Sequence, residues 1–111
     1  MSNLIEWILE ETNEYEIEAV VIGELGWGDY GKENIPNYDK QPRQTILTWK
    51  EAKSWLDYEF DSGYGSPMCN AIYVWTKNKI LFISQYDGAT SLNSIPRNPT
   101  DEIMPTMPGG G

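Results

Sequence analysis

Histidine is absent from the 111-residue chain, and Cys69 is the only cysteine. Without histidine the chain has no Ser-His or Cys-His pair and lacks the side chain that most often serves as a general base or zinc ligand. A single cysteine excludes an internal disulfide and a thiol-rich metal site. We therefore expect no enzyme activity, no metal and no cofactor, with Cys69 as a buried, inert thiol in a reducing compartment.

Basic residues are scarce as well. Eight Lys and Arg stand against seventeen Asp and Glu, which gives a formal net charge of -9. Binding to nucleic acid or to an anionic membrane depends on Lys and Arg, so both are disfavoured. Residues 1–31 contain eight acids and no base, so most of the negative charge lies in the first quarter of the chain. This distribution predicts a basic protein partner.

Long apolar runs are missing too, and the first residues lack the basic start of a signal peptide. We expect a cytoplasmic protein that is neither exported nor inserted into a membrane. The composition, 40% hydrophobic and 13% aromatic, is typical of a globular chain. We predict one domain over residues 1–96, followed by an extended or disordered tail over 97–111, where Pro and Gly are frequent.

The first third of the chain predicts one helix and one strand. Ser2 is the expected N-cap of the helix, and a core-facing stripe follows at helical spacing: Leu4, Ile5, Ile8 and Leu9. From Tyr15 to Ile22 the period changes to two, which indicates a strand with Glu16 and Glu18 on one face.

The rest of the chain predicts a second helix and a three-stranded meander. Thr48 and Glu51 match a capping box, so a helix is expected from Trp49 to about Tyr58. Strands are expected over 71–76, 79–86 and 90–95, joined by turns at 77–78 and 87–88. We predict an α+β fold: an antiparallel sheet of four to five strands, with two helices packed on one face.

Acidic side chains on the first helix and strand form the first candidate binding surface. We call it the acidic surface, and it comprises Glu6, Trp7, Glu10, Glu14, Glu16 and Glu18. Like charges one helical turn apart repel one another, and basic groups on a partner would turn this repulsion into attraction. An exposed tryptophan is a common interface anchor. The alternative is a solvated face that only keeps the chain soluble, with Trp7 at the edge of the core.

Two loops rich in glycine and aromatic residues, 23–31 and 61–67, form the second candidate. They carry Trp27, Tyr30 and Tyr64, and rigid aromatics on flexible backbone are typical of binding loops. The spacing of Gly26, Gly28 and Gly31 fits a phosphate-binding pattern, but no confident helix follows and nearby acids repel anions. The alternative is a pair of ordinary turns.

These features favour a non-catalytic acidic protein-binding module, acting as an inhibitor or antagonist of a basic protein that handles nucleic acid. In size and charge the chain is similar to small acidic inhibitors that phages and mobile elements use against host defences. That likeness implies a viral protein in the host cytoplasm whose carboxylates mimic nucleic-acid phosphates.

The sequence is also compatible with other classes of function. It leaves the oligomeric state open and allows a homodimer. One alternative is a protein that binds or sequesters a small or nucleotide-like molecule between the two aromatic loops. Another is a ubiquitin-like or sulfur-carrier protein, because such proteins also end in Gly-Gly, as residues 109–111 do. A third is a carboxylate hydrolase site in which four acids combine with Arg97 or with a bound divalent cation: Asp57, Glu59, Asp61 and Asp87.

Overall fold

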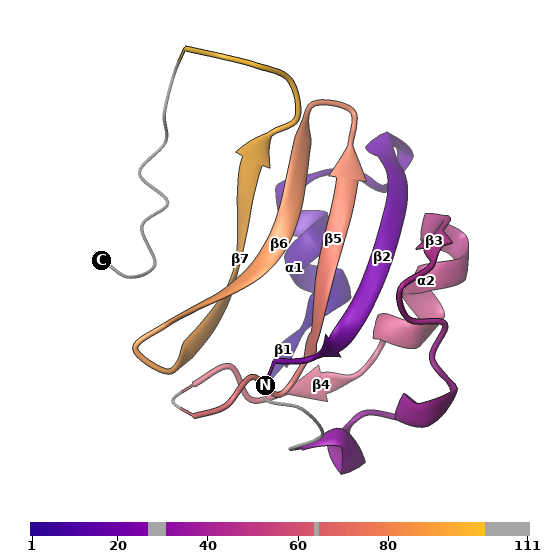
Figure 1. The fold of residues 1–111 in the computed structure, drawn as a ribbon, viewed down its shortest axis with the longest axis vertical. Helices are drawn as coiled ribbons and strands as arrows, with labels where there is room; N and C mark the ends of the chain where they lie inside the picture. The colour runs from indigo at the N-terminus through magenta and orange to yellow at the C-terminus, as the bar shows by residue number, and fades with distance from the viewer. Residues whose placement is uncertain (27–30, 64, 102–111) are drawn as a thin grey trace.

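The computed structural model describes residues 1–26, 31–63 and 65–101. A twisted antiparallel sheet forms one layer, and two helices form a second layer on one of its faces (Figure 1). The predicted α+β fold is therefore confirmed. Within the described residues, no helix has the length and apolar character needed to span a membrane.

The main sheet has five strands in the order β3-β2-β5-β6-β7, and every neighbouring pair is antiparallel. The strands are β2 (Ile17–Leu25), β3 (Ile46–Leu47), β5 (Asn70–Thr76), β6 (Lys79–Tyr86) and β7 (Ala89–Pro96). The last three form the predicted meander. Asp87 and Gly88, with φ angles of 51° and 84°, make the tight turn between β6 and β7, as expected of Asp-Gly in a two-residue hairpin loop.

The two helices are α1 (Leu4–Glu11) and α2 (Trp49–Leu56), and they bury one face of the sheet. Their buried residues meet alternate residues of the strands, so the core lies between helices and sheet. The core includes Leu4, Ile8, Val20, Ile22, Trp49, Ala52, Leu56, Ile72, Val74 and Leu81. The capping box of Thr48 and Glu51 is present at the start of α2, as predicted.

The start of the chain differs from the prediction in two respects. The N-cap of α1 is Asn3, whose Oδ1 accepts a hydrogen bond from the Ile5 N–H at 2.8 Å. Ser2 instead pairs with Phe60, because β1 (Ser2–Asn3) and β4 (Glu59–Phe60) form a small second sheet. Leu9, expected in the core stripe, is 44% exposed, since the eight-residue helix buries a narrower face.

Strand β2 also begins later and ends later than predicted. A short 3₁₀ helix, η1 (Glu14–Glu16), precedes it, because the Asn13 side chain accepts hydrogen bonds from the N–H groups of Tyr15 and Glu16. Tyr15 is consequently 91% exposed. At its far end β2 continues to Leu25, into the region expected to be a loop.

A buried polar network attaches the connection between β2 and β3 to the sheet. This connection contains η2 (Lys32–Asn34) and η3 (Tyr38–Lys40). Asn70 is fully buried, and its side-chain amide exchanges two hydrogen bonds with Gln41. The same amide donates to the Gly23 carbonyl at 2.8 Å. The network thus fixes the backbone around Gly23, which borders the candidate site.

Candidate functional site

The face of the sheet opposite the helices is covered by no described element. We call it the open face, and its residues follow from strand alternation and register. They are Ala19, Val21, Gly23, Ile46, Ala71, Tyr73, Trp75, Ile80, Phe82, Ser84, Tyr86, Ala89, Ser91, Asn93 and Ile95. None of them is charged, although 23% of the chain is.

Apolar side chains on the open face run across all five strands. One row joins Ile46, Val21, Tyr73 and Phe82 through direct pairing. A second row joins Ala19, Trp75, Ile80 and Ile95. Within these rows Ile46 is 78%, Tyr73 55% and Ile95 46% exposed to solvent. A contiguous exposed apolar area of this kind is uncommon on monomeric proteins and usually marks an interaction site.

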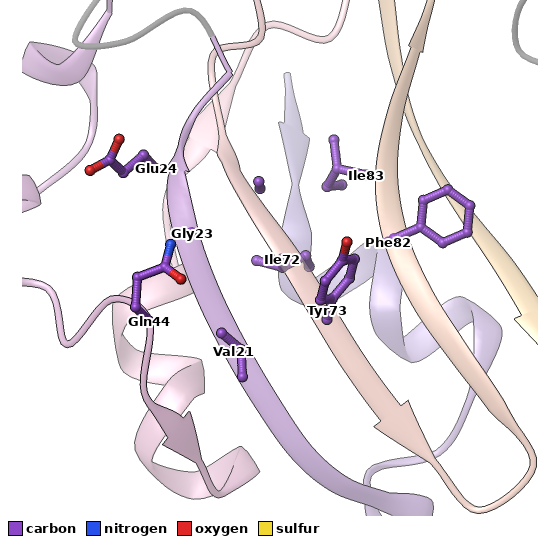
Figure 2. A pocket seen from close by; sticks show the side chains of 9 residues that line it. Val21, Gly23, Glu24, Gln44, Ile72, Tyr73, Phe82 and Ile83 are labelled. Atoms are coloured by element: carbon purple, nitrogen blue, oxygen red, sulfur yellow. The ribbon is translucent and has the colours of Figure 1, made fainter. Parts of the chain in front are cut away.

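A hollow of about 300 Å³ indents the open face between β2, β5 and β6. The bottom of the hollow is formed by Gly23, which has no side chain, and by Ala71, which has a small one. The two residues are close together, since a Cβ on Gly23 would lie 3.3 Å from the Cβ of Ala71. Figure 2 shows Glu24 and Gln44 on the β2 side of the hollow and Tyr73 on the side nearer β6.

Two backbone irregularities bring polar groups to the rim of this hollow. The register of β2 and β5 shifts between Ile22 and Leu25, and such a bulge re-aims a side chain, here that of Glu24. Gln44 adopts a φ of 60°, which is uncommon for a residue other than glycine, and its N–H donates to the Ile22 carbonyl at 2.9 Å. Both side chains therefore line the hollow.

A second hollow, of about 310 Å³, lies next to the first, and Tyr73 and Phe82 line both. Its remaining lining residues are Trp75, Ile80 and Ile95, so it is almost entirely apolar. The Tyr73 and Trp75 rings meet edge to face with centroids 5.8 Å apart. This contact holds two aromatic side chains in place on the exposed surface.

The part of the acidic surface carried by α1, Glu6, Trp7 and Glu10, lies on the other side of the sheet, because α1 covers the opposite face. Glu6 and Glu10 are exposed there, and in the described part of the chain neither forms an ion pair. Trp7 is only partly exposed, and its ring packs edge to face on Phe60 with centroids 5.2 Å apart. It therefore contributes to the edge of the core.

The other three acids of the acidic surface contact residues far away in the sequence. The Glu14 carboxylate accepts a hydrogen bond from the Trp49 indole N–H at 3.3 Å. Glu16 is half-buried, and its carbonyl accepts from the Lys77 N–H. Glu18 forms an ion pair with Arg97.

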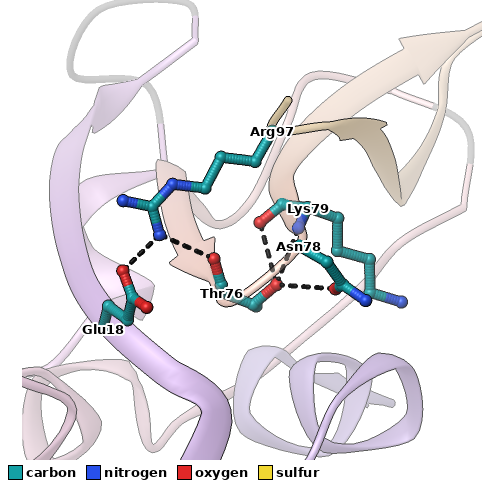
Figure 3. A network of polar contacts seen from close by, with 5 residues as sticks. All are labelled: Glu18, Thr76, Asn78, Lys79 and Arg97. Atoms are coloured by element: carbon teal, nitrogen blue, oxygen red, sulfur yellow. Dashed lines mark hydrogen bonds and ion pairs between the residues drawn. The ribbon is translucent and has the colours of Figure 1, made fainter. Parts of the chain in front are cut away.

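Arg97 joins the end of β7 to the neighbouring strands, as Figure 3 shows. Besides the ion pair with Glu18, its Nη1 donates to the Thr76 carbonyl at 2.9 Å, and its backbone N–H donates to the Asn78 carbonyl. The Thr76 hydroxyl closes the adjacent turn through hydrogen bonds with Lys79. These contacts attach the residue that follows β7 to the neighbouring part of the sheet.

Arg97 lies far from Asp87, one of the four carboxylates of the hydrolase hypothesis. Asp87 precedes β7 and Arg97 follows it, so an eight-residue strand, about 26 Å long at 3.3 Å per residue, separates them. Asp61 accepts from the Gly63 N–H at 2.8 Å, and Asp57 accepts from the Asn3 amide at 3.4 Å. In the described residues, no three acidic or thiol groups lie close enough together to hold a metal ion.

The remaining sequence candidates are an aromatic set and a thiol. Trp27, Tyr30 and Tyr64 lie outside the described residues. Cys69 is buried, as expected, and burial raises the pKa of its thiol to about 12. The thiolate is therefore a minor species at neutral pH.

Sequence reasoning missed the open face, although a signal for it was present. In β5 and β6 the core positions Ile72, Val74 and Leu81 alternate with Tyr73 and other apolar residues, so both faces of these strands are apolar. In a strand covered on one side only, apolar residues normally alternate with polar ones.

No protein-family model matches the chain, and comparisons with curated proteins and with solved structures found no significant match.

Proposed function

We propose that this chain is a non-catalytic binding module whose open face docks on a basic protein. The observation that carries the proposal is the uncharged, aromatic, solvent-exposed face of the main sheet. The centre of a protein interface is depleted in charge and enriched in tyrosine, tryptophan and phenylalanine. Tyr73, Trp75 and Phe82 supply these three residue types side by side on two adjacent strands.

The strong negative charge supports a basic partner. The strand residues of the open face are uncharged, and Glu24 is the only described acid among the residues that line its two hollows, so a docking partner would not have to desolvate a carboxylate over the rest of the contact. A net charge of -9 would steer a positively charged protein toward this chain and raise the rate of encounter. In this proposal the charge speeds association, and the apolar area supplies the affinity.

The chain would act as an antagonist if its partner binds nucleic acid through the same basic surface on which the chain docks. The acidic chain and the nucleic acid would then compete for that surface, with or without close imitation of phosphates. Competition between the chain and a duplex for the purified partner, measured by fluorescence anisotropy, tests this part separately. Simultaneous binding of both would contradict antagonism and leave docking intact.

Two double variants test the docking surface. Ile46→Ser with Tyr73→Ser removes one aliphatic and one aromatic side chain from the open face. Leu9→Ser with Tyr15→Ser makes the same changes at exposed positions elsewhere. Each anchor lost from an interface costs about 1 kcal/mol or more, so the first variant should bind at least about tenfold more weakly.

The measurement is quantitative capture of proteins from a lysate of the source cells by each variant, at low and at high salt. We expect a basic protein to be retained by the original chain and by the Leu9/Tyr15 variant, but lost by the Ile46/Tyr73 variant. A third variant, Glu6→Lys with Glu10→Lys, tests the acidic surface. Equal retention by the two serine variants, combined with loss in the lysine variant, would move the site to α1 and refute docking on the open face.

A further inference from the structure

We infer that the hollow bounded by Gly23, Ala71 and Tyr73 is a receptor for an arginine side chain of the docking partner. This inference rests on the proposed function and names the partner group that the hollow would accept. Its volume of about 300 Å³ is at the lower limit for small-molecule sites, which suits one long side chain.

The shape of the hollow fits a side chain with an apolar stem. Gly23 and Ala71 leave the floor open, and the Tyr73 ring and Phe82 lie on the side toward β6. The methylene groups of a long side chain would contact this floor, as the stems of lysine and arginine do on apolar surfaces.

The charge of the hollow favours a cation over an anion. No Lys or Arg lines it, whereas the Glu24 carboxylate and the Gln44 amide do. The Glu24 side chain is exposed and forms no ion pair or hydrogen bond with other described residues, so its charge is available to a ligand. The exposed Tyr73 ring adds an electron-rich face to which cations are attracted.

The planar guanidinium group fits this combination better than an ammonium group. It stacks on an aromatic ring and can donate two parallel hydrogen bonds to a carboxylate. The chain itself contains one contact between a guanidinium group and an aromatic ring: the Arg43 guanidinium carbon lies 4.1 Å from the centroid of the Tyr38 ring. The neighbouring apolar hollow would accept an apolar side chain of the same partner.

The test uses N-acetyl-L-arginine N-methylamide as a probe, titrated into the ¹⁵N-labelled full chain and followed by NMR. We expect saturable shift changes at the amides of Gly23, Ala71 and Tyr73. The citrulline analogue has nearly the same shape but no charge, and it should bind about tenfold more weakly because it loses both the ring contact and the ion pair.

Three variants locate the site. Ala71→Leu fills the hollow and should abolish the shift changes, whereas Ser54→Leu, at an exposed position of α2 outside the open face, should leave them unchanged. Glu24→Gln should weaken binding about threefold, as expected for the loss of an exposed ion pair. The amide spectrum of each variant reports whether it is folded.

Several results would overturn the inference: equal binding of the citrulline analogue, shift changes that persist in Ala71→Leu, or no saturable change up to the solubility limit of the probe. Such a result leaves the proposed function standing if the Ile46/Tyr73 variant still loses its partner. Conversely, if the probe binds in the hollow while that variant keeps its partner, the arginine site stands and docking on the open face fails.

Discussion

At the scale of single residues, Asn70 and Tyr58 form a buried contact through two hydrogen bonds. The Tyr58 hydroxyl donates to Asn70 Oδ1 at 2.8 Å and accepts from the Asn70 backbone N–H at 2.9 Å. Burial raises the pKa of Tyr58 above its ordinary value of 10.0, although the hydrogen bond from Asn70 opposes this effect. The phenol therefore stays protonated and keeps both bonds at neutral pH.

Tyr58→Phe should lower the free energy of unfolding by about 1–3 kcal/mol, because it leaves the buried Asn70 N–H without its acceptor. Tyr15→Phe removes the same hydroxyl from a side chain that is 91% exposed, and it should change stability by less than about 0.5 kcal/mol. Urea unfolding of both variants checks the difference. Equal losses would mean that the network around Asn70 adds nothing to stability.

At the scale of elements, α2 depends on its first turn. The Thr48 hydroxyl accepts from the Glu51 N–H at 3.1 Å, and the Glu51 carboxylate accepts from the Thr48 N–H at 2.9 Å. Hydrogen bonding with Thr48 lowers the pKa of Glu51 below its ordinary value of 4.5, and the Thr48 backbone contributes more to this shift than the Thr48 side chain does. A lowered pKa in the folded state means that this stabilisation is present above pH 4.5 and is lost as the carboxyl group becomes protonated.

Thr48→Ala should destabilise the protein by about 1 kcal/mol, because an N–H group at the start of α2 loses its acceptor. Thr48→Ser keeps a hydroxyl and should retain most of the stability. Thermal unfolding followed by circular dichroism at neutral pH compares the two. A serine variant as unstable as the alanine variant would show that the methyl group of Thr48, and not its hydroxyl, is what matters.

At the scale of the whole molecule, the carboxylates of α1 and the exposed apolar face occupy different sides. The helices carry exposed acids such as Glu6 and Glu10, whereas the strand residues of the open face are uncharged and Glu24 lies only at the rim of its hollow. Mutual repulsion between copies at neutral pH opposes contact between their open faces. That protection disappears near the isoelectric point, about pH 4.3.

We therefore expect the chain to self-associate more strongly near pH 4.3 than at pH 7, and to do so through the open face. Light scattering or sedimentation across this range measures the effect. The Ile46→Ser, Tyr73→Ser variant should associate less than the Leu9→Ser, Tyr15→Ser variant, although both carry the same net charge. Similar association of the two variants would contradict a role for the open face.

Local signals in the sequence were sufficient to predict most elements. The capping box of Thr48 and the hairpin at Asp87-Gly88 depend on neighbouring residues only, and both are present as predicted. The start of β2 was misplaced, because Asn13 caps a 3₁₀ turn that interrupts the alternating pattern. The β1–β4 ladder was missed, because two-residue strands carry no periodic signal.

The sequence by itself determined the charge, the absence of histidine and the apolar character of both faces of β5 and β6. Only the tertiary structure decided which apolar face is covered, because that depends on which side of the sheet the helices pack. It also decided the partners of residues in the acidic surface: Glu18 pairs with Arg97, 79 positions away, and Trp7 packs on Phe60. Long-range contacts of this kind leave no local pattern, so the residues of a surface can be identified only after the chain has folded.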